Sequence, residues 1–238
     1  MKKGYVDTRW GQLHYRAMGN DGPTILLFHE SPLSSVVYED VIPLMAEVSR
    51  VYAFDTPGYG ESSGPPMEVE IPDYSATILE GLDNLGLETF SVVGCHTGAS
   101  IALEIAQQAG PSRVEKVVFS GLPLLTEEER ADFLANWAPS ISPDIEGSHY
   151  NWAWERYVNI WKEPAEVLHI GATLLLSNLE KYNLAYNAAF RYDPLPAVNS
   201  LEHPILFITA EFDILIESDR RCVGILPKAE LEIIGNCI

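Results

Sequence analysis

The stretch Phe90-Ser91-Val92-Val93-Gly94-Cys95-His96-Thr97-Gly98 decides the fold of this chain. Its apolar and β-branched beginning is typical of a buried strand, and the Ala-rich pattern over 99–109 that follows it is typical of a helix. The two flanking glycines let backbone segments approach closely across a tight turn. Strand, tight turn and helix in this order form a nucleophile elbow, whose central residue projects into a pocket.

The central residue of this elbow is His96, at the position where a serine hydrolase has serine. The backbone amide of Thr97 lies at the start of the following helix, where N–H groups lack partners within the helix and attract negative charge. The sequence therefore predicts a site for nucleophilic chemistry in which an imidazole replaces the usual hydroxyl.

Composition narrows the class of protein. The chain has 238 residues, and its 15 Lys and Arg against 34 Asp and Glu give a formal charge of −19, which argues against binding to nucleic acid. No apolar run approaches the length of a membrane span, and no leader pattern opens the chain. The three cysteines have no C-x-x-C spacing. We expect a cytoplasmic protein with free thiols, no metal and no cofactor.

Strand and helix patterns alternate along most of the chain, which predicts a doubly wound, mostly parallel α/β sheet. The expected strands cover 12–18, 24–28, 51–54, 90–93, 114–119, 204–209 and 231–234, and the expected helices include 35–48, 73–86 and 99–109. Between Leu122 and Asn199 helical patterns follow one another without a strand. We therefore divide the chain into a core, 1–121 and 200–238, and an inserted helical cap, 122–199.

Three further motifs carry a resemblance to a known family. They are His29-Glu30-Ser31-Pro32, similar to a His-Gly-x-Pro loop; 55–62, Asp-Thr-Pro-Gly-Tyr-Gly-Glu-Ser, similar to Asp-x-x-Gly-x-Gly-x-Ser; and Ala210-Glu211-Phe212-Asp213, similar to Gly-x-x-Asp. With the elbow, they make the chain resemble the α/β-hydrolase superfamily, of the capped epoxide-hydrolase and haloalkane-dehalogenase-like type, over essentially its whole length. The elbow histidine resembles that of a bacterial subgroup.

The resemblance implies roles for particular residues. Asp213 corresponds to the acid of the catalytic triad, and Ser31 and Thr97 correspond to the positions whose backbone amides form the oxyanion hole. His96 would then act as a general base, with direct attack of its imidazole on the substrate as the less favoured alternative. In both roles Asp213 would accept a hydrogen bond from one ring nitrogen and so fix the tautomer.

The C-terminal part departs from the family pattern. No histidine follows His203, and the family's final helix is missing after the last expected strand, which would leave one edge of the sheet poorly covered. Two explanations stay open: the polypeptide is incomplete, or the catalytic arrangement differs.

The sequence thus predicts a hydrolase for a small apolar or aromatic ester, lactone or C–C substrate, with the elbow histidine in place of serine. Two alternatives remain: a catalytically silent protein that binds a small molecule, and a cofactor-independent lyase or oxygenase in which His96 removes a carbon-bound proton. The expected partner is a small-molecule substrate, with neither nucleic acid nor membrane, and a homodimer is left open.

Residues near the elbow have competing interpretations. Glu30 either tunes the protonation of His96 or is a solvated loop residue, with the second favoured, and His29 is expected to orient its loop. Both are nevertheless candidates for substrate contact, together with Trp154 and Trp161. Cys95 is expected to be a buried structural thiol.

The expected cap contains four of the five tryptophans. Tyr150, Trp154, Tyr157 and Trp161 recur at helical spacing, which predicts one apolar helix face at the seam between cap and sheet. Cap cations are expected in solvent, with recognition of a substrate carboxylate as the alternative; they are Arg130, Arg156, Lys162, Lys181 and Arg191. Thr126 and Glu129 have the spacing of a capping box at a helix start.

Overall fold

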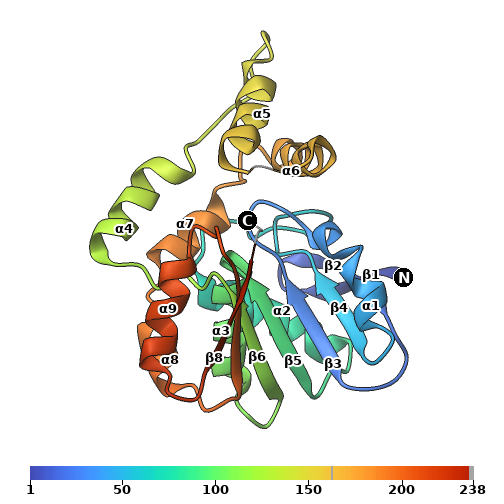
Figure 1. Cartoon of the computed structure of the whole chain (residues 1–238). Helices are drawn as coiled ribbons and strands as arrows, with labels where there is room; N and C mark the ends of the chain where they lie inside the picture. Colours follow the sequence, from blue (N-terminus) through green and yellow to red (C-terminus); the bar gives the residue numbers. More distant parts are fainter. Residues whose placement is uncertain (162, 236–238) are drawn as a thin grey trace.

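A computed structural model of the chain describes residues 1–161 and 163–235, and its centre is one eight-stranded sheet (Figure 1). The strand order is β1-β2-β4-β3-β5-β6-β7-β8, with the β1–β2 and β2–β4 pairs antiparallel and all other pairs parallel. The predicted doubly wound α/β architecture is confirmed. The strands are β1 (Lys2–Thr8), β2 (Gly11–Met18), β3 (Thr24–Phe28), β4 (Arg50–Phe54), β5 (Phe90–Cys95), β6 (Val114–Ser120), β7 (Ile205–Ala210) and β8 (Glu230–Ile234).

The register of the parallel strands brings the loops of the site together. Phe28, at the end of β3, pairs with Phe54 of β4 on one side and with Gly94 of β5 on the other. Cys95 pairs in turn with Ser120, the last residue of β6. Because these strands end at the same level, the loops that follow them meet at one edge of the sheet, which is where ligands bind in open α/β folds.

Helices cover the two faces of the sheet unequally. Leu26 and Phe28 belong to a large cluster with α2, α3, α7, α8 and α9, whereas Leu27 packs against Ile42 of α1 on the other face. The helical elements are η1 (Ser35–Tyr38), α1 (Val41–Met45), α2 (Ile71–Asn84), α3 (Thr97–Ala109), α4 (Glu127–Asp132), η2 (Phe133–Trp137), α5 (Ser148–Ile160), α6 (Ala165–Ser177), α7 (Leu184–Arg191), α8 (Leu195–Ser200) and α9 (Ile216–Ile225).

The cap lies above the carboxyl edge of the sheet and has its own apolar cluster (Figure 1). That cluster joins Ala153 and Tyr157 of α5 with Leu168 and Leu175 of α6. The alanines of α7 and the apolar residues Ala197 and Val198 of α8 belong to the main core, whereas Tyr186 of α7 packs against the cap cluster. Helices α7 and α8 also contact α3, so the last part of the range expected as cap, 122–199, packs on the core as well as on the cap cluster.

Several local differences from expectation have physical causes. The helix expected over 35–48 is two short elements, η1 and α1, because Pro43 has no N–H to donate and fits only within the first turn of a helix. Strand β1 and helix α9 were not predicted, since their polar residues hide the apolar periodicity. At the β8 edge, Ile233 and Ile234 are 42% and 50% exposed, which agrees with the expected poor coverage over the described residues.

Candidate active site

The elbow residue has a strained backbone. His96 has φ 47° and ψ −110°, and among the described residues it is the one non-glycine position with positive φ. Close approach of the neighbouring chain imposes this turn: a Cβ on Gly94 would lie 2.2 Å from the Gly98 carbonyl oxygen, and a Cβ on Gly98 would lie 2.1 Å from that of Phe28. Strain of this kind occurs where the surrounding structure holds a side chain in a functional orientation.

Asp213 holds the imidazole of His96. Nε2 of His96 lies 2.9 Å from Oδ2 of Asp213, and the two side chains are only 13% and 8% exposed. Asp213 follows β7, and its Oδ1 accepts a hydrogen bond of 2.7 Å from the Leu215 amide. The arrangement assigns the Nε2 proton to the bond with the carboxylate. Nδ1 then has a free lone pair, and no residue in the described parts of the chain hydrogen-bonds to it.

Electrostatics favours the charged forms of this pair. Burial alone would lower the pKa of His96, but the hydrogen bond and charge of Asp213, with a smaller effect of Glu30, raise that pKa above its ordinary value. Burial likewise would raise the pKa of Asp213, but the hydrogen bond with His96 lowers it. His96 is therefore a stronger base than a free imidazole.

A glycine that the sequence analysis missed makes room for the ring. A Cβ on Gly121, which has φ +66°, would lie 2.3 Å from Cδ2 of His96. The carboxylate of Asp219 accepts hydrogen bonds of 2.8 Å from the amides of Gly121 and Leu122, which fixes this segment. Asp219 is fully buried, and burial raises its pKa. The sequence signal available was a glycine at the end of a predicted strand beside the elbow.

The two expected oxyanion residues lie beside His96. Ser31, Thr97 and His96 all line one small hollow. Thr97 begins α3, so its amide has no carbonyl acceptor within the helix. Across the described residues, no hydrogen-bond acceptor contacts the backbone amides of Ser31 or Thr97. Both N–H groups are thus available to a ligand.

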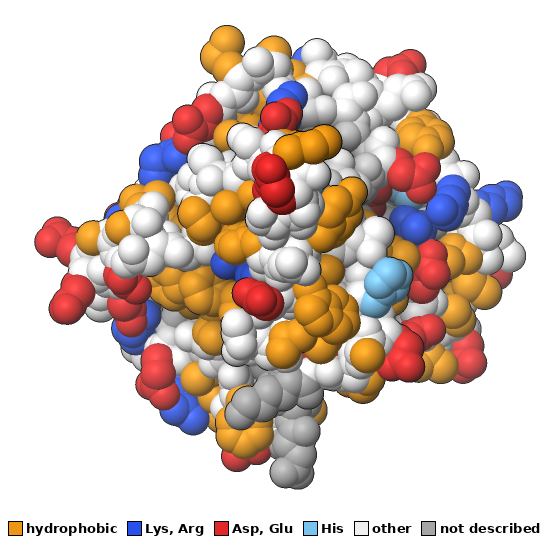
Figure 2. Space-filling view, turned by 90° about the horizontal axis from the view of Figure 1, so that it is seen from above, with side chains coloured by type: hydrophobic (Ala, Val, Ile, Leu, Met, Phe, Trp, Pro, Cys, Tyr) orange, Lys and Arg blue, Asp and Glu red, His pale blue; other side chains and the backbone are white. Residues whose placement is uncertain are grey.

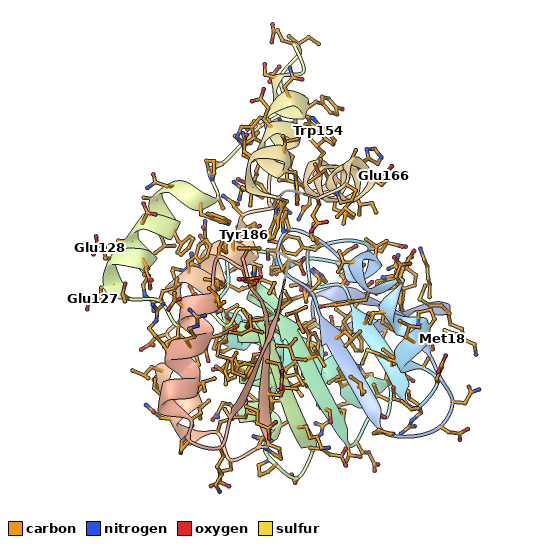
Figure 3. The ribbon with its side chains drawn as sticks, in the orientation of Figure 1. Met18, Glu127, Glu128, Trp154, Glu166 and Tyr186 are labelled. Carbon is orange, nitrogen blue, oxygen red and sulfur yellow. The ribbon has the colours of Figure 1, made fainter. Side chains whose placement is uncertain are left out.

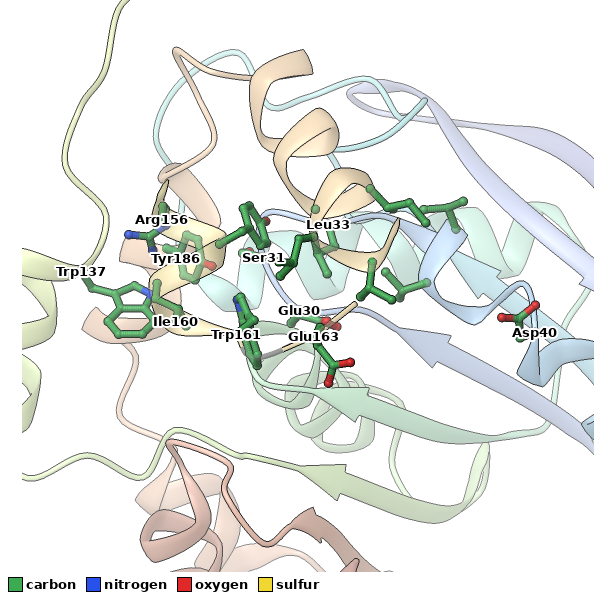
Figure 4. Close-up of a pocket in the computed structure, with 17 residues that line it drawn as sticks. Glu30, Ser31, Leu33, Asp40, Trp137, Arg156, Ile160, Trp161, Glu163 and Tyr186 are labelled. Atoms are coloured by element: carbon green, nitrogen blue, oxygen red, sulfur yellow. The ribbon is translucent and has the colours of Figure 1, made fainter. Parts of the chain in front are cut away.

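Two hollows adjoin at this site. The one lined by His96 has a volume of about 20 Å³, and the other, beneath the cap, has a volume of about 310 Å³. Both hollows are lined by Ser31, Trp137, Trp161 and Tyr186, and Figure 4 shows the larger of the two. The smaller hollow has room for about one water molecule. The larger one has the size of a pocket for a small molecule.

The predicted substrate-contact residues divide into two groups. Glu30 and Trp161 line the larger cavity, and the charge of Glu30 contributes to the raised pKa of His96. His29 is fully buried, with Nδ1 2.8 Å from the Glu30 carbonyl oxygen and Nε2 accepting from the Thr56 amide, so it orients the loop and does not line the cavity.

Trp154 corrects the expectation for the cap stripe. Trp154 and Tyr150 are 40% and 60% exposed, and Figure 3 shows Trp154 on α5 well away from the sheet. Only Tyr157, which is 7% exposed, and Trp161 contribute to the apolar cluster and the cavity. Trp161 follows the last residue of α5 and has an extended backbone, so the four predicted residues do not share one helix face. Apolar side chains such as Trp154 stay exposed on this side of the molecule, which Figure 2 shows from above.

The remaining predictions concern cysteines, metals and membranes. Cys95 and Cys222 are free thiols that line neither hollow, and burial raises the pKa of Cys95, whereas Cys237 lies outside the described residues. Over residues 1–161 and 163–235, no group of three His, Cys, Asp or Glu side chains is placed to hold a metal ion. Within the same ranges, no helix is both long and apolar enough to cross a membrane.

Comparison with known proteins decides the family. The model for the alpha/beta hydrolase fold matches residues 23–141, half of the chain. The chain belongs to the α/β-hydrolase family. The chain is 34% identical to the carboxylesterase YbfK of Bacillus subtilis over 116 residues, which cover 48% of this chain and 39% of that protein. It is 31% identical to a haloalkane dehalogenase of Mesorhizobium japonicum over 107 residues, which cover 45% of this chain and 34% of that protein. The aligned part thus spans well under half of each relative's length.

Solved structures agree on the fold. The bromoperoxidase of Bacillus anthracis superposes with a TM-score of 0.83 at 19% identity, over 98% of this chain and 91% of that one. At this identity the likeness establishes the architecture alone.

Proposed function

We propose that this α/β-hydrolase cleaves small apolar or aromatic esters or lactones, with His96 acting as a general base in place of an elbow serine. The hydrogen bond of 2.9 Å between Nε2 of His96 and Asp213 carries the proposal, because it leaves Nδ1 free to accept a proton. The names of the relatives, a carboxylesterase and a haloalkane dehalogenase, support hydrolysis as the type of reaction.

The proposed reaction uses a water molecule in the small hollow. Nδ1 of His96 takes one proton from this water as its oxygen attacks the ester carbonyl carbon, and Asp213 stabilises the imidazolium that forms. The amides of Ser31 and Thr97 donate hydrogen bonds to the resulting oxyanion. When the intermediate collapses, the C–O bond to the leaving group breaks and the imidazolium gives its proton to the alkoxide. The products are a carboxylic acid and an alcohol.

The size of the two hollows supports water attack over direct attack by the ring. The hollow next to His96 is only large enough for about one water, whereas the substrate requires the adjoining cavity of about 310 Å³. In this arrangement water separates the imidazole from the carbonyl carbon, and no acyl-histidine forms.

The test measures hydrolysis of p-nitrophenyl acetate and butyrate by the whole chain and two variants. We expect His96→Ala to lower kcat about 10²-fold to 10⁴-fold, the range for loss of a general base. His169→Ala is the matched control, because it removes an exposed imidazole of α6 that lines neither hollow.

Three results would overturn the proposal: full activity in His96→Ala, an acyl-histidine trapped by acid quench and located by mass spectrometry, or ester binding without turnover by the wild-type chain. The last result would instead favour a protein that only binds small molecules.

A further inference from the structure

The basic residues of the cap differ in what they contact. Arg130 donates hydrogen bonds of 2.6 and 2.8 Å to the carbonyl oxygens of Phe190 and Tyr192. Arg191 forms ion pairs with two glutamates on the segment that precedes α2. Lys181 is exposed, and Lys162 lies outside the described residues. Only Arg156 combines a position on the large cavity with a guanidinium that has no carboxylate partner within the described chain.

Aromatic side chains surround the guanidinium of Arg156. It lies 5.3 Å from the ring centre of Trp137 and 5.8 Å from that of Trp152. It also lies near Tyr186: burial raises the pKa of the Tyr186 hydroxyl, and the charge of Arg156 partly opposes the rise. Its Nη2 atom is buried and has no hydrogen-bond partner within the described parts of the chain. Figure 4 shows Arg156 beside Trp137 and Tyr186 at one side of the cavity.

A buried N–H donor without a partner costs about 1–3 kcal/mol, and more where the group is charged. A guanidinium presents its donors in a planar fork that matches the two oxygens of a carboxylate. The guanidinium thus has an unused donor and no carboxylate partner in the described chain, and a ligand carboxylate would supply both the opposite charge and the acceptor geometry.

We propose that Arg156 binds a carboxylate group of the substrate, so that the natural substrate is a small ester or lactone that also carries a carboxylate. The part of this proposal that concerns the natural substrate rests on the proposed hydrolysis. The carboxylate site itself is independent of catalysis.

The charges in the cavity orient such a substrate. Glu30 and Glu163 line the cavity beside Trp161, whereas Arg156 lies near Trp137 (Figure 4). The glutamates repel an anionic group and direct it to Arg156. Trp137 and Tyr186, which adjoin Arg156, also line the hollow of His96. These two side chains connect the Arg156 side of the cavity with the hollow of His96, so a small molecule held at Arg156 by its carboxylate would direct its uncharged ester group toward that hollow.

The binding experiment uses two unreactive probes of equal length, hexanoate and hexanamide. Binding is measured by calorimetry and by tryptophan fluorescence, to which Trp137 and Trp152 contribute. We expect the wild-type chain to prefer hexanoate, and Arg156→Met to weaken hexanoate binding about 10-fold to 100-fold while hexanamide binding changes little. Arg156→Lys should keep part of the preference, because it keeps the charge without the fork.

Two controls make the result interpretable. Arg220→Met removes an exposed arginine of α9 that lines neither hollow, and its hexanoate binding should equal that of the wild type. Circular dichroism and the thermal midpoint establish that Arg156→Met is folded. Equal affinities for hexanoate in folded Arg156→Met and wild type would overturn the proposal, as would a wild-type chain that prefers hexanamide.

An activity experiment separates this inference from the proposed function. Hydrolysis of monoethyl adipate is compared with that of diethyl adipate, and we expect kcat/KM to favour the monoester by about 10-fold or more in the wild type but not in Arg156→Met. Arg156-dependent hexanoate binding without ester turnover would disprove the hydrolysis and retain the carboxylate site. Turnover that depends on His96 but ignores the carboxylate would disprove the site and retain the hydrolysis.

Discussion

Replacement of Asp213 by asparagine tests the electrostatics of the site directly. The carboxylate accepts a hydrogen bond of 2.9 Å from Nε2 of His96, and both side chains are largely buried, so solvent screens the interaction little. A hydrogen bond to a charged group contributes about 1.5–3 kcal/mol. Since about 1.4 kcal/mol corresponds to one pKa unit, Asp213→Asn should lower the pKa of His96 by about one to two units.

The assay combines an NMR titration of the His96 ring with the pH dependence of kcat/KM. In the wild type, the acid limb of the profile should lie above about pH 6.5, because the pKa of His96 is raised and only the neutral ring accepts a proton. In Asp213→Asn the acid limb of the kcat/KM profile should move to lower pH, and the plateau value of kcat/KM should fall because His96 is then a weaker base. Asp144→Asn is the matched control, since it removes a cap carboxylate that pairs with His149 at 3.5 Å.

Stability provides a second measurement on the same variant. The raised pKa of His96 adds stability that is present below its unfolded value of about 6.5 and is lost as pH rises through the folded value. The lowered pKa of Asp213 adds stability present above about pH 3.9. Urea unfolding should therefore separate wild type and variant most between about pH 4 and 6.5. An unchanged His96 titration in Asp213→Asn would refute the reasoning.

Two glycine substitutions test the geometry around the site. Gly121→Ala should lower activity by about 10²-fold, because the new Cβ would lie 2.3 Å from the His96 ring and displace it. The control is Gly86→Ala, at a similar φ of +69° with open space around it, which should cost only about 1–2 kcal/mol of stability in a urea titration and leave activity intact. Equal losses of activity in the two variants would contradict this prediction. Gly171→Ala should distort the cap cavity, since its Cβ would meet the Tyr157 ring at 2.3 Å. We expect a higher KM with little change in kcat, and an unaltered KM would show that the cap accommodates the methyl group.

The sequence predicted the buried parallel strands well because their residues are apolar on both faces. The strand expected over 24–28 matches β3 in full, for this reason. β1 was missed because it is a half-exposed edge strand in which lysine, tyrosine and aspartate obscure the alternation. Secondary structure that rests on continuous burial can be read from one sequence, whereas edge elements depend on neighbours that the sequence does not specify.

The site was predictable where one motif fixes the backbone and less so where distant segments meet. The elbow glycines predicted His96 at the turn, and the resemblance of residues 210–213 to Gly-x-x-Asp predicted Asp213 as its partner; the two side chains lie 2.9 Å apart. Gly121 carried no motif, and its importance depends on where the imidazole points. The choice of Arg156 among the cap cations was also inaccessible, because it depends on which of the others already have partners.

The tight turn at residue 96 is set by its glycine neighbours and not by the imidazole itself. The glycines would therefore keep the turn in place if another side chain stood at residue 96, and exchange of that side chain need not rebuild the sheet. A serine at this position would remove the ring whose Nε2 atom lies 2.9 Å from Asp213, and the carboxylate would lose the imidazole partner that it has in the described chain. Within the described chain, a serine at the turn would therefore act as a nucleophile only after another substitution places an imidazole between its hydroxyl and the carboxylate of Asp213.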